Sequence, residues 1–422
     1  MSESFNIEKV AVLGTGVMGA QIAAHLTNAN IPVLGFDVNQ EVAEKGIEMS
    51  TKIKPSAYYN PKTVEMITPL NYDEHIKQIS ECDWIIEVIA ERLDWKLDLF
   101  NKIQPHLKKN AIITSNTSGI SASDLISKMN NDMAARFFIT HFFNPPRYMK
   151  LVEIIQSKKT DTNLIPPMAK FLEESLGKGV VYANDTPNFI ANRIGVYGMM
   201  VTLDEAKKKN ISIEDVDNLT GTLIGRPKSA TFRTSDIVGL DTMCFVANTA
   251  YNKCINDPEK DIFKIPGYLQ KMVENKWLGQ KAKQGFYKKI DKGVIHSIDI
   301  NSLEYTPQNK KRYAGIKLAK ENIRVGDRIK ALINSDDKAG QFVWEISSKA
   351  LLYSAGRMNE IADDIVNIDR AMRWGFGWDL GPFEIWDAIG VSKSIIRMKD
   401  ENKTIPEWVI TMLGKGGNTF YR

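Results

Sequence analysis

A glycine-rich turn between a short apolar strand and a helix is the feature that most limits the fold of this chain. Residues 10–13 predict the strand, and the turn that follows has the GxGxxG spacing. The first glycine permits a tight turn, the second lets a pyrophosphate approach the backbone, and the third allows close helix–strand packing. Free N–H groups at the helix start then face the phosphates. The expected cofactor contacts here are Gly14, Gly16, Val17, Met18 and Gly19.

An acidic residue ends the second predicted strand, which covers residues 33–36. Asp37 is placed to accept hydrogen bonds from both ribose hydroxyls of a dinucleotide and to repel a 2′-phosphate. A glycine turn in a fold without a cofactor is the alternative interpretation. Strand, turn, helix and terminal acid together favour NAD binding over that alternative.

Composition excludes several classes of protein. The 422 residues are 43% hydrophobic and 25% charged, which is typical of a soluble globular protein of two to four domains. A net charge of +4 is too small to argue for nucleic acid. No segment reaches the ~20 apolar residues of a membrane span, and we expect a cytoplasmic protein. Three cysteines without metal or redox spacing fit a reducing compartment and predict no metal site.

The N-terminal part of the chain alternates strands with helices. This pattern predicts a mostly parallel, doubly wound α/β sheet of the Rossmann type over residues 1–183. Helical spacing covers residues 93–103 and 167–176. The further predicted strands are 84–89, 111–114, 137–139, 151–155 and 179–182.

The remainder of the chain is predicted to be two related all-α domains. Thr186 and Pro187 predict a helix start, and the helix that follows is apolar on most sides. Segments 216–239 and 368–390 resemble each other, and each copy ends on a Phe-Tyr pair. We therefore expect a first helical domain, a linker, and a second, degenerate helical domain. Their ranges are 184–290, 291–332 and 333–422.

Four polar residues stand where apolar packing is expected: Ser118, His141, Glu153 and Asn192. Glu153 interrupts an apolar strand, and a buried carboxylate is costly unless it is paired. His141 is the nearest plausible partner. A carboxylate on one imidazole nitrogen fixes the tautomer and favours the other nitrogen as a general base.

Each of these residues also has a structural interpretation. His141 alone is more often a core histidine, and Glu153 has Lys150 as another partner. Ser118 is a candidate helix cap, and Asn192 a candidate for bonding nearby backbone.

Several longer motifs together resemble the 3-hydroxyacyl-CoA dehydrogenase family. The resemblance covers about residues 5–290, and the second helical domain is similar to the duplicated domain of longer members. In those, a dehydrogenase is often fused to an enoyl-CoA hydratase, so the chain looks like the dehydrogenase portion alone. The motifs are NTS at 116–118, HFFNP at 141–145, MKLVEII at 149–155, DTPNFIANR at 185–193 and GQKAKQGFY at 279–287.

The resemblance implies NAD-dependent, reversible oxidation of an L-3-hydroxyacyl-CoA. His141 becomes the general base and Glu153 its partner, while Ser118 and Asn192 bind the substrate. It implies cofactor contacts at Asp37, Glu91, Lys96, Asn144 and Lys281, and a coenzyme A contact at Ser50.

The chain also departs from the family pattern. Residues 146–148 replace a small apolar residue after HFFNP, which changes the mouth of the site. A downstream lysine for coenzyme A has only Lys52 or Lys54 as substitutes. In the second copy, Glu345 stands where Asn192 lies in the first, so we expect that copy to be structural.

Other assignments stay open from the sequence. The alternatives are a dehydrogenase of a free β-hydroxy acid and a non-catalytic NAD-binding scaffold for a hydratase subunit. An enoyl-CoA hydratase is a possible partner, and neither nucleic acid nor a membrane is expected. Short relatives pair their helical domains between subunits, so the internal duplication makes a monomer plausible.

Overall fold

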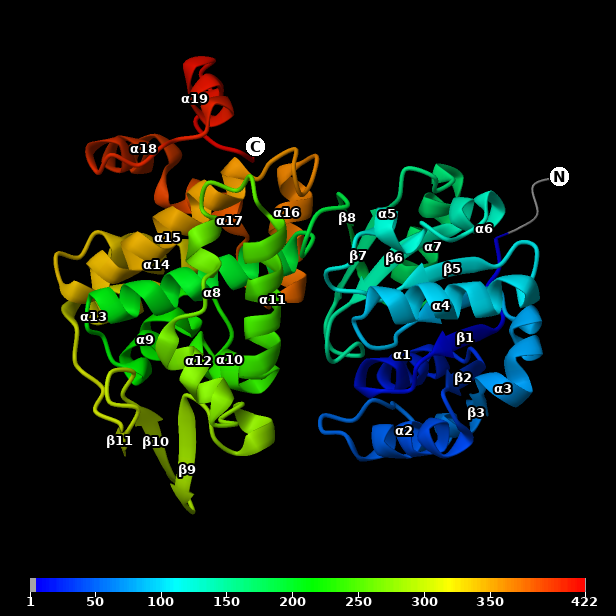
Figure 1. Cartoon of the computed structure of the whole chain (residues 1–422). Coiled ribbons are helices and arrows are strands. Elements are labelled where there is room, and N and C mark those ends of the chain that lie inside the picture. Colours follow the sequence, from blue (N-terminus) through cyan, green and yellow to red (C-terminus); the bar gives the residue numbers. More distant parts are fainter. Residues whose placement is uncertain (1–4, 422) are drawn as a thin grey trace. The chain divides into compact units, whose positions relative to one another are not determined.

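The computed structural model describes residues 5–421 and divides after Phe189 into two compact units. The part up to Phe189 is called the N-terminal unit and the part from Ile190 the helical unit (Figure 1). The strands of the N-terminal unit are β1 Val10–Leu13, β2 Val33–Asp37, β3 Ile67–Asn71, β4 Trp84–Glu87, β5 Ile112–Ser115, β6 Phe137–Phe142, β7 Leu151–Gln156 and β8 Gly179–Ala183. Its helices are α1 Val17–Thr27, α2 Gln40–Lys52, α3 Tyr72–His75, α4 Leu93–Ile103, α5 Ala122–Leu125, α6 Asn131–Ala135 and α7 Ile165–Glu174.

The N-terminal unit is built on one eight-stranded sheet in the order β3-β2-β1-β4-β5-β6-β7-β8. All neighbours are parallel except β6 and β7, which are antiparallel. Strand order moves outward from β1 in both directions, as in a doubly wound fold. The Rossmann-type sheet expected from the sequence is therefore confirmed.

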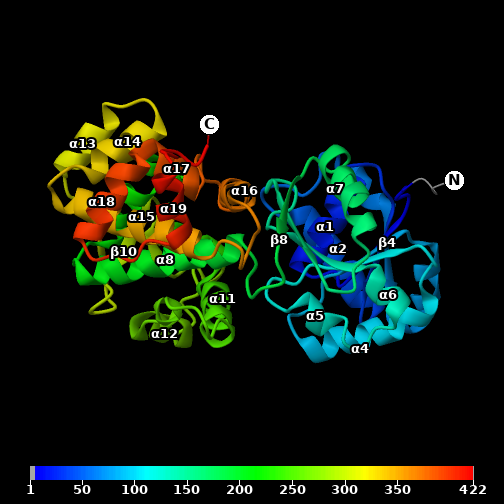
Figure 2. The same cartoon turned by 90° about the horizontal axis from the view of Figure 1, so that it is seen from above.

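Both faces of this sheet are covered by helices, because its strands are apolar on both sides. Val12 of β1 packs in one cluster with Ala23 of α1 and Met168 of α7. On the other face, Phe100 of α4 lies edge-on to Phe137 of β6, with ring centroids 5.5 Å apart. Figure 2 shows α7 and α4 on opposite sides of the strands.

The sequence pattern missed strand β3 and misplaced one helix start. The β3 segment contains Pro69, which cannot donate to a ladder, and such strands occur at sheet edges. The helix expected from Thr186 begins at Ala191, because Asn188 and Phe189 have positive φ angles of 66° and 51°.

The helical unit contains twelve helices among its described residues and a small antiparallel sheet in the order β11-β10-β9. Residues 291–332, expected as a linker, contain most of that sheet and two helices. No described helix is long and apolar enough to cross a membrane. The helices are α8 Ala191–Lys208, α9 Ile213–Thr220, α10 Phe232–Val238, α11 Leu240–Lys253, α12 Gly267–Glu274, α13 Ala314–Lys320, α14 Val325–Ile333, α15 Lys338–Gly356, α16 Ile365–Gly375, α17 Pro382–Ile389, α18 Val391–Asp400 and α19 Glu407–Gly414. The strands are β9 Tyr287–Asp291, β10 Val294–Ile298 and β11 Tyr305–Pro307.

The first helical copy is held by two aspartates, the half-buried Asp217 and the buried Asp236. Asp217 on α9 accepts hydrogen bonds from the backbone N–H of Phe232, at 2.7 Å, and from the Tyr287 hydroxyl, at 2.8 Å. Asp236 on α10 accepts from the N–H groups of Phe286 and Tyr287, at 2.8 and 2.9 Å. The carboxylates thus connect the helices to the closing Phe-Tyr pair.

The second copy repeats this network at the corresponding positions. Asp369 on α16 accepts from the N–H of Phe383, at 2.9 Å, and from the Tyr421 hydroxyl, at 2.8 Å. Asp387 on α17 accepts from the N–H groups of Phe420 and Tyr421, at 2.8 and 2.9 Å. Two copies with the same buried contacts support the relatedness that the sequence predicts.

We predict that Tyr287→Phe and Tyr421→Phe each lower the free energy of unfolding by about 1–3 kcal/mol, because a buried carboxylate loses a donor. Burial raises the pKa of Asp217 to about 6 and that of Asp369 to about 7. Both carboxylates are charged above those values, so the loss should be larger at pH 8 than at pH 5. Urea unfolding at the two pH values measures it.

The control is Tyr59→Phe, which changes an exposed tyrosine of the N-terminal unit. It should unfold like the unmodified chain. If Tyr287→Phe also unfolds like the unmodified chain at pH 8, the carboxylate network does not contribute as described.

Candidate active site

The glycine turn has one open position between two crowded ones. Gly14 has a φ of +101°, and a Cβ there would lie 2.8 Å from the carbonyl oxygen of Val88. A Cβ at Gly19 would lie 1.8 Å from the carbonyl oxygen of Gly14. At Gly16, just before α1, a Cβ meets no atom within 4 Å. A pyrophosphate therefore fits against Gly16 at the N-terminus of α1.

Asp37 is fixed beside this turn at the end of β2. Its Oδ2 accepts hydrogen bonds from the backbone N–H and the hydroxyl of Thr15, at 2.7 and 2.8 Å. The carboxylate is half-buried and keeps a solvent-facing edge. An acid held here is suited to bind ribose hydroxyls, as expected from the sequence.

His141 and Glu153 form a buried pair across the antiparallel strands β6 and β7. The two residues are direct partners in the strand register, and His141 Nδ1 lies 2.7 Å from Glu153 Oε2. Glu153 is fully buried and His141 is 5% exposed. The carboxylate orients the imidazole through Nδ1 and leaves Nε2 for a substrate. The predicted pairing of these two side chains is therefore present in the structure.

Aromatic rings surround the imidazole. The rings of Phe143 and Phe189 have their centroids 4.5 and 5.6 Å from that of His141. Such walls limit the access of water and hold the ring in one orientation.

The other predicted residues of the N-terminal unit follow the carboxyl ends of parallel strands. The glycine turn follows β1, Asp37 ends β2, Glu91 follows β4, and Ser118 follows β5. Carboxyl ends of parallel strands lie at one edge of a sheet, where such folds bind their ligands. His141, near the end of β6, belongs to the same edge.

Glu91 connects the loop after β4 to the loop that contains Ser118. Its Oε1 accepts hydrogen bonds from the Thr117 hydroxyl, at 2.6 Å, and from the backbone N–H groups of Ser118 and Gly119, each at 3.0 Å. Ser118 itself is half-buried. Ser121, not Ser118, provides the side-chain cap of α5. The cap interpretation of Ser118 is therefore wrong.

Lys96 lies beneath this edge rather than on its surface. Its side chain is 1% exposed, and its Nζ is 2.6 Å from Glu87 Oε1 and 3.5 Å from Glu91 Oε2. Glu87 is fully buried and also binds the hydroxyl of Ser115. Glu87 is a site residue that the sequence motifs did not predict. Its only signal was an acid at the end of an apolar strand, the pattern that pointed to Asp37.

The loop between β6 and β7 is fixed from several sides. Asn144 accepts a hydrogen bond from Gln21 of α1 at 3.1 Å, which connects the loop to the helix of the glycine turn. Arg147 donates to the carbonyl oxygens of Ser56 and Tyr58, at 2.7 and 2.9 Å. The residues that depart from the family pattern thus bind this loop to the segment after α2.

A buried lysine also binds the loop between β6 and β7. Lys178 is 5% exposed and donates to the carbonyl oxygens of Pro146 and Met149. Burial lowers its pKa to about 8. Its contacts fix the loop that directly follows His141.

Ser50 of α2 is buried, whereas a residue that contacts a ligand directly is expected to be accessible. It is 1% exposed, donates to the carbonyl oxygen of Ile47 at 2.6 Å, and lies 2.7 Å from the Tyr58 hydroxyl. Its expected contact with coenzyme A stays a prediction, and Tyr58 covers the hydroxyl in this structure.

Two predicted residues belong to the helical unit. Asn192 lies in the first turn of α8 and is half-buried. Lys281 pairs with Asp241, with Nζ and Oδ2 2.6 Å apart, on the exposed surface. Among residues 5–421, no group of His, Cys, Asp and Glu is arranged to hold a metal ion.

Comparisons with known proteins agree with this architecture. Residues 9–186 match the family model of the 3-hydroxyacyl-CoA dehydrogenase NAD binding domain, and residues 189–289 match the C-terminal domain of the same family. A crystal structure of 3-hydroxybutyryl-CoA dehydrogenase from Escherichia coli K12 aligns with 92% of this chain and 93% of that chain, with a TM-score of 0.67. At 20% identity, this likeness concerns the fold alone.

Two curated relatives are closer in sequence. A probable 3-hydroxyacyl-CoA dehydrogenase of Bacillus subtilis is 46% identical over 99% of this chain, which spans 55% of that protein. Another, from Deinococcus radiodurans, is 42% identical over 67% of this chain and 83% of that protein. The chain therefore belongs to the 3-hydroxyacyl-CoA dehydrogenase family of NAD-dependent oxidoreductases.

Proposed function

We propose that this chain oxidises an L-3-hydroxyacyl-CoA to the 3-ketoacyl-CoA with NAD, reversibly. The observation that carries the proposal is the buried contact of 2.7 Å between His141 and Glu153. A histidine oriented by a carboxylate and flanked by aromatic rings is suited to move a proton to and from an alcohol.

In this proposal His141 accepts the proton of the 3-hydroxyl group at Nε2. Glu153 stabilises the imidazolium that forms, through the bond to Nδ1. NAD, when bound, supplies the acceptor for the hydride that leaves C3. The backbone around Gly16 and the carboxylate of Asp37 would hold the dinucleotide, and we assign Asn144 to its nicotinamide end.

We assign substrate binding to Ser118 and Asn192, each with a hydrogen-bonding group for the 3-oxygen or the thioester carbonyl. The bond from the Ser118 N–H to Glu91 fixes the position of that serine. The His–Glu pair argues for an acyl-CoA thioester over a free β-hydroxy acid, since the resemblance implies a lysine in place of this pair in dehydrogenases of free β-hydroxy acids. The hydratase partner stays a prediction.

The decisive assay follows NADH oxidation with acetoacetyl-CoA and, separately, with free acetoacetate. We expect turnover with the thioester only. His141→Gln should bind NADH normally and lose roughly 10²–10⁴-fold in turnover, because it removes the general base.

His106→Gln is the matched control, a half-buried histidine that lies outside the proposed site. It should leave turnover unchanged. Equal rates with free acetoacetate would contradict the proposed substrate, and near-normal turnover of His141→Gln would contradict the proposed base.

Asp37→Ala should weaken NADH binding by roughly 10–100-fold, since hydrogen bonds to a charged group are worth about 1.5–3 kcal/mol. It should bind NADPH with little loss, because the repulsion of the 2′-phosphate disappears with the carboxylate. Fluorescence titration with both nucleotides measures this. Asp73→Ala, which changes an exposed acid, is the control. Equal affinity of the unmodified chain for NADH and NADPH would contradict the role of Asp37.

The packing of the two helical copies supports a monomer. Tyr197 of α8 stacks on Tyr353 of α15 with centroids 3.7 Å apart. The fully buried Arg193 donates to the Tyr353 hydroxyl at 2.5 Å and pairs with Asp257 at 2.6 Å. The second copy thus covers this face of α8 within the chain, where a helical domain of another subunit would otherwise be able to pack.

We therefore predict that light scattering gives the mass of a single chain at every protein concentration tested. Tyr353→Ala opens the covered surface of α8 and should promote self-association. A dimer of the unmodified chain built through α8 would contradict the proposal.

A further inference from the structure

Two glycine turns of the helical unit face each other, one from each copy. Gly225 and Gly377 have φ angles of +72° and +66°, and the N–H of Asp379 donates to the carbonyl oxygen of Gly225 at 2.7 Å. The residue after each glycine differs between the copies. Arg226 in the first stacks on Trp378 in the second, with its guanidinium 4.3 Å from the ring centroid.

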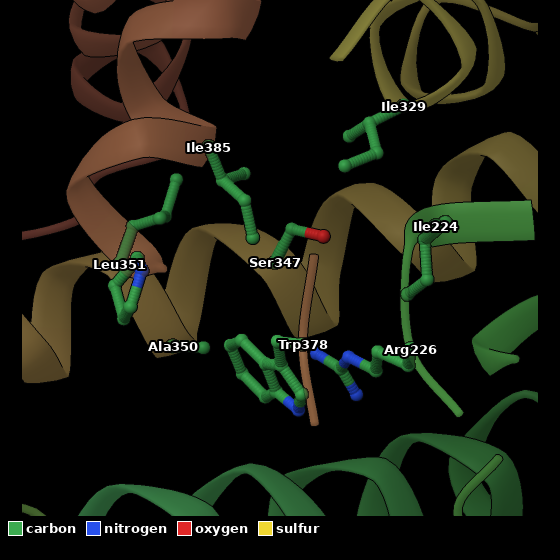
Figure 3. Close-up of a pocket in the computed structure, with 9 residues that line it drawn as sticks. Ile224, Arg226, Ile329, Ser347, Ala350, Leu351, Trp378 and Ile385 are labelled. Carbon is green, nitrogen blue, oxygen red and sulfur yellow. The ribbon is translucent and has the colours of Figure 1, made fainter. Parts of the chain in front are cut away.

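Two cavities border this stacked pair. The smaller, of about 10 Å³, is shown in Figure 3 and the larger measures about 30 Å³. In Figure 3 the guanidinium of Arg226 reaches toward the indole of Trp378. Ile224, Ile329, Ser347, Ala350, Leu351, Pro382 and Ile385 complete the smaller cavity. Gly195, Gly198, Met199, Pro227, Ala230, Thr231, Thr234 and Phe376 complete the larger one.

The two cavities differ in the helix that lines them. Ser347 and Ala350 of α15 line the smaller cavity, and two glycines of α8, Gly195 and Gly198, line the larger. A Cβ at Gly195 would collide with Phe376 at 2.0 Å, whereas a Cβ at Gly198 meets no atom within 4 Å. The missing side chain at Gly198 therefore leaves the extra room.

Arg226 borders both cavities without an acidic partner. Within the described residues, no carboxylate oxygen lies within 4 Å of the guanidinium nitrogens. The guanidinium packs on the face of Trp378 instead. Arg226 is half-buried, and desolvation of its guanidinium lowers its pKa to about 10. The aromatic face offsets part of the cost of burying this charge, and a counter-ion would offset more.

We propose that the larger cavity, beside Gly198, binds a small monovalent anion through Arg226. The guanidinium supplies charge-assisted hydrogen bonds, which are among the strongest in proteins. Bound there, the ion connects a turn of the first copy to Trp378 of the second and stabilises the contact between them.

The size of the cavity sets the chemical class. A single water needs roughly 10–15 Å³ by the same measure, so about 30 Å³ holds an ion of the size of chloride or formate. An acyl chain or a nucleotide does not fit. The site is thus separate from the proposed chemistry, and its test does not depend on turnover.

The experiment measures thermal unfolding of the full chain at constant ionic strength, with sodium gluconate replaced stepwise by chloride, bromide, formate or propionate. We expect chloride, bromide and formate to raise the midpoint saturably, by about 2–4 °C. Propionate should act like gluconate, because both are too large. The halide and carboxylate series then identify the preferred ion.

Arg226→Met should abolish the saturable shift, because the ion loses its charge partner. Gly198→Ala, which retains Arg226 and fills the cavity, should reduce it strongly. Arg324→Met is the matched control, an exposed arginine at the start of α14, and should keep the full shift.

The proposal is overturned by the absence of a saturable shift in the unmodified chain, by a full shift in a folded Arg226→Met chain, or by the same shift in Gly198→Ala and Arg324→Met. Should Arg226→Met fail to fold, Gly198→Ala still decides. Crystals grown in bromide give a direct check, since an anomalous peak beside Arg226 is expected and its absence at saturating bromide counts against the site.

Discussion

The reversal of strand direction between β6 and β7 is the constraint on which the candidate chemistry depends. Because β7 runs antiparallel to β6, a short loop joins them and Glu153 comes directly opposite His141. A parallel neighbour would need a long crossover and would place that loop elsewhere. The same reversal therefore pairs the buried acid with the imidazole and brings Asn144 to the helix of the glycine turn.

Charged groups at the carboxyl edge of the sheet are linked beneath the surface. Lys96 is shared between Glu87 and Glu91, and Glu91 in turn binds the backbone at Ser118. A buried lysine between two acids is strongly positioned, because breaking either contact leaves an uncompensated charge. The cofactor and substrate sides of the proposed site are thus held by one network.

The duplicated helical copies keep their internal contacts and differ where they meet. Asp217 and Asp369 hold equivalent positions, each bonded to the tyrosine hydroxyl of its copy's closing Phe-Tyr pair. At the contact between the copies, Arg226 lies in the glycine turn of the first copy and Trp378 in that of the second. The residues that each copy needs in order to fold are the same in both copies. The residues at the contact between the copies differ.

The sequence by itself predicted the alternating strands and helices of the N-terminal unit apart from β3, the glycine turn, and the pairing of His141 with Glu153. These features depend on the spacing of residues that are close together in the sequence, and that spacing follows the periodicity of the local backbone. Only the tertiary structure decided that Tyr58 covers Ser50, that Lys96 lies buried, and that the helix after Phe189 starts late. Strand register, side-chain burial and positive φ angles arise when distant segments pack, and no short pattern in the chain encodes them.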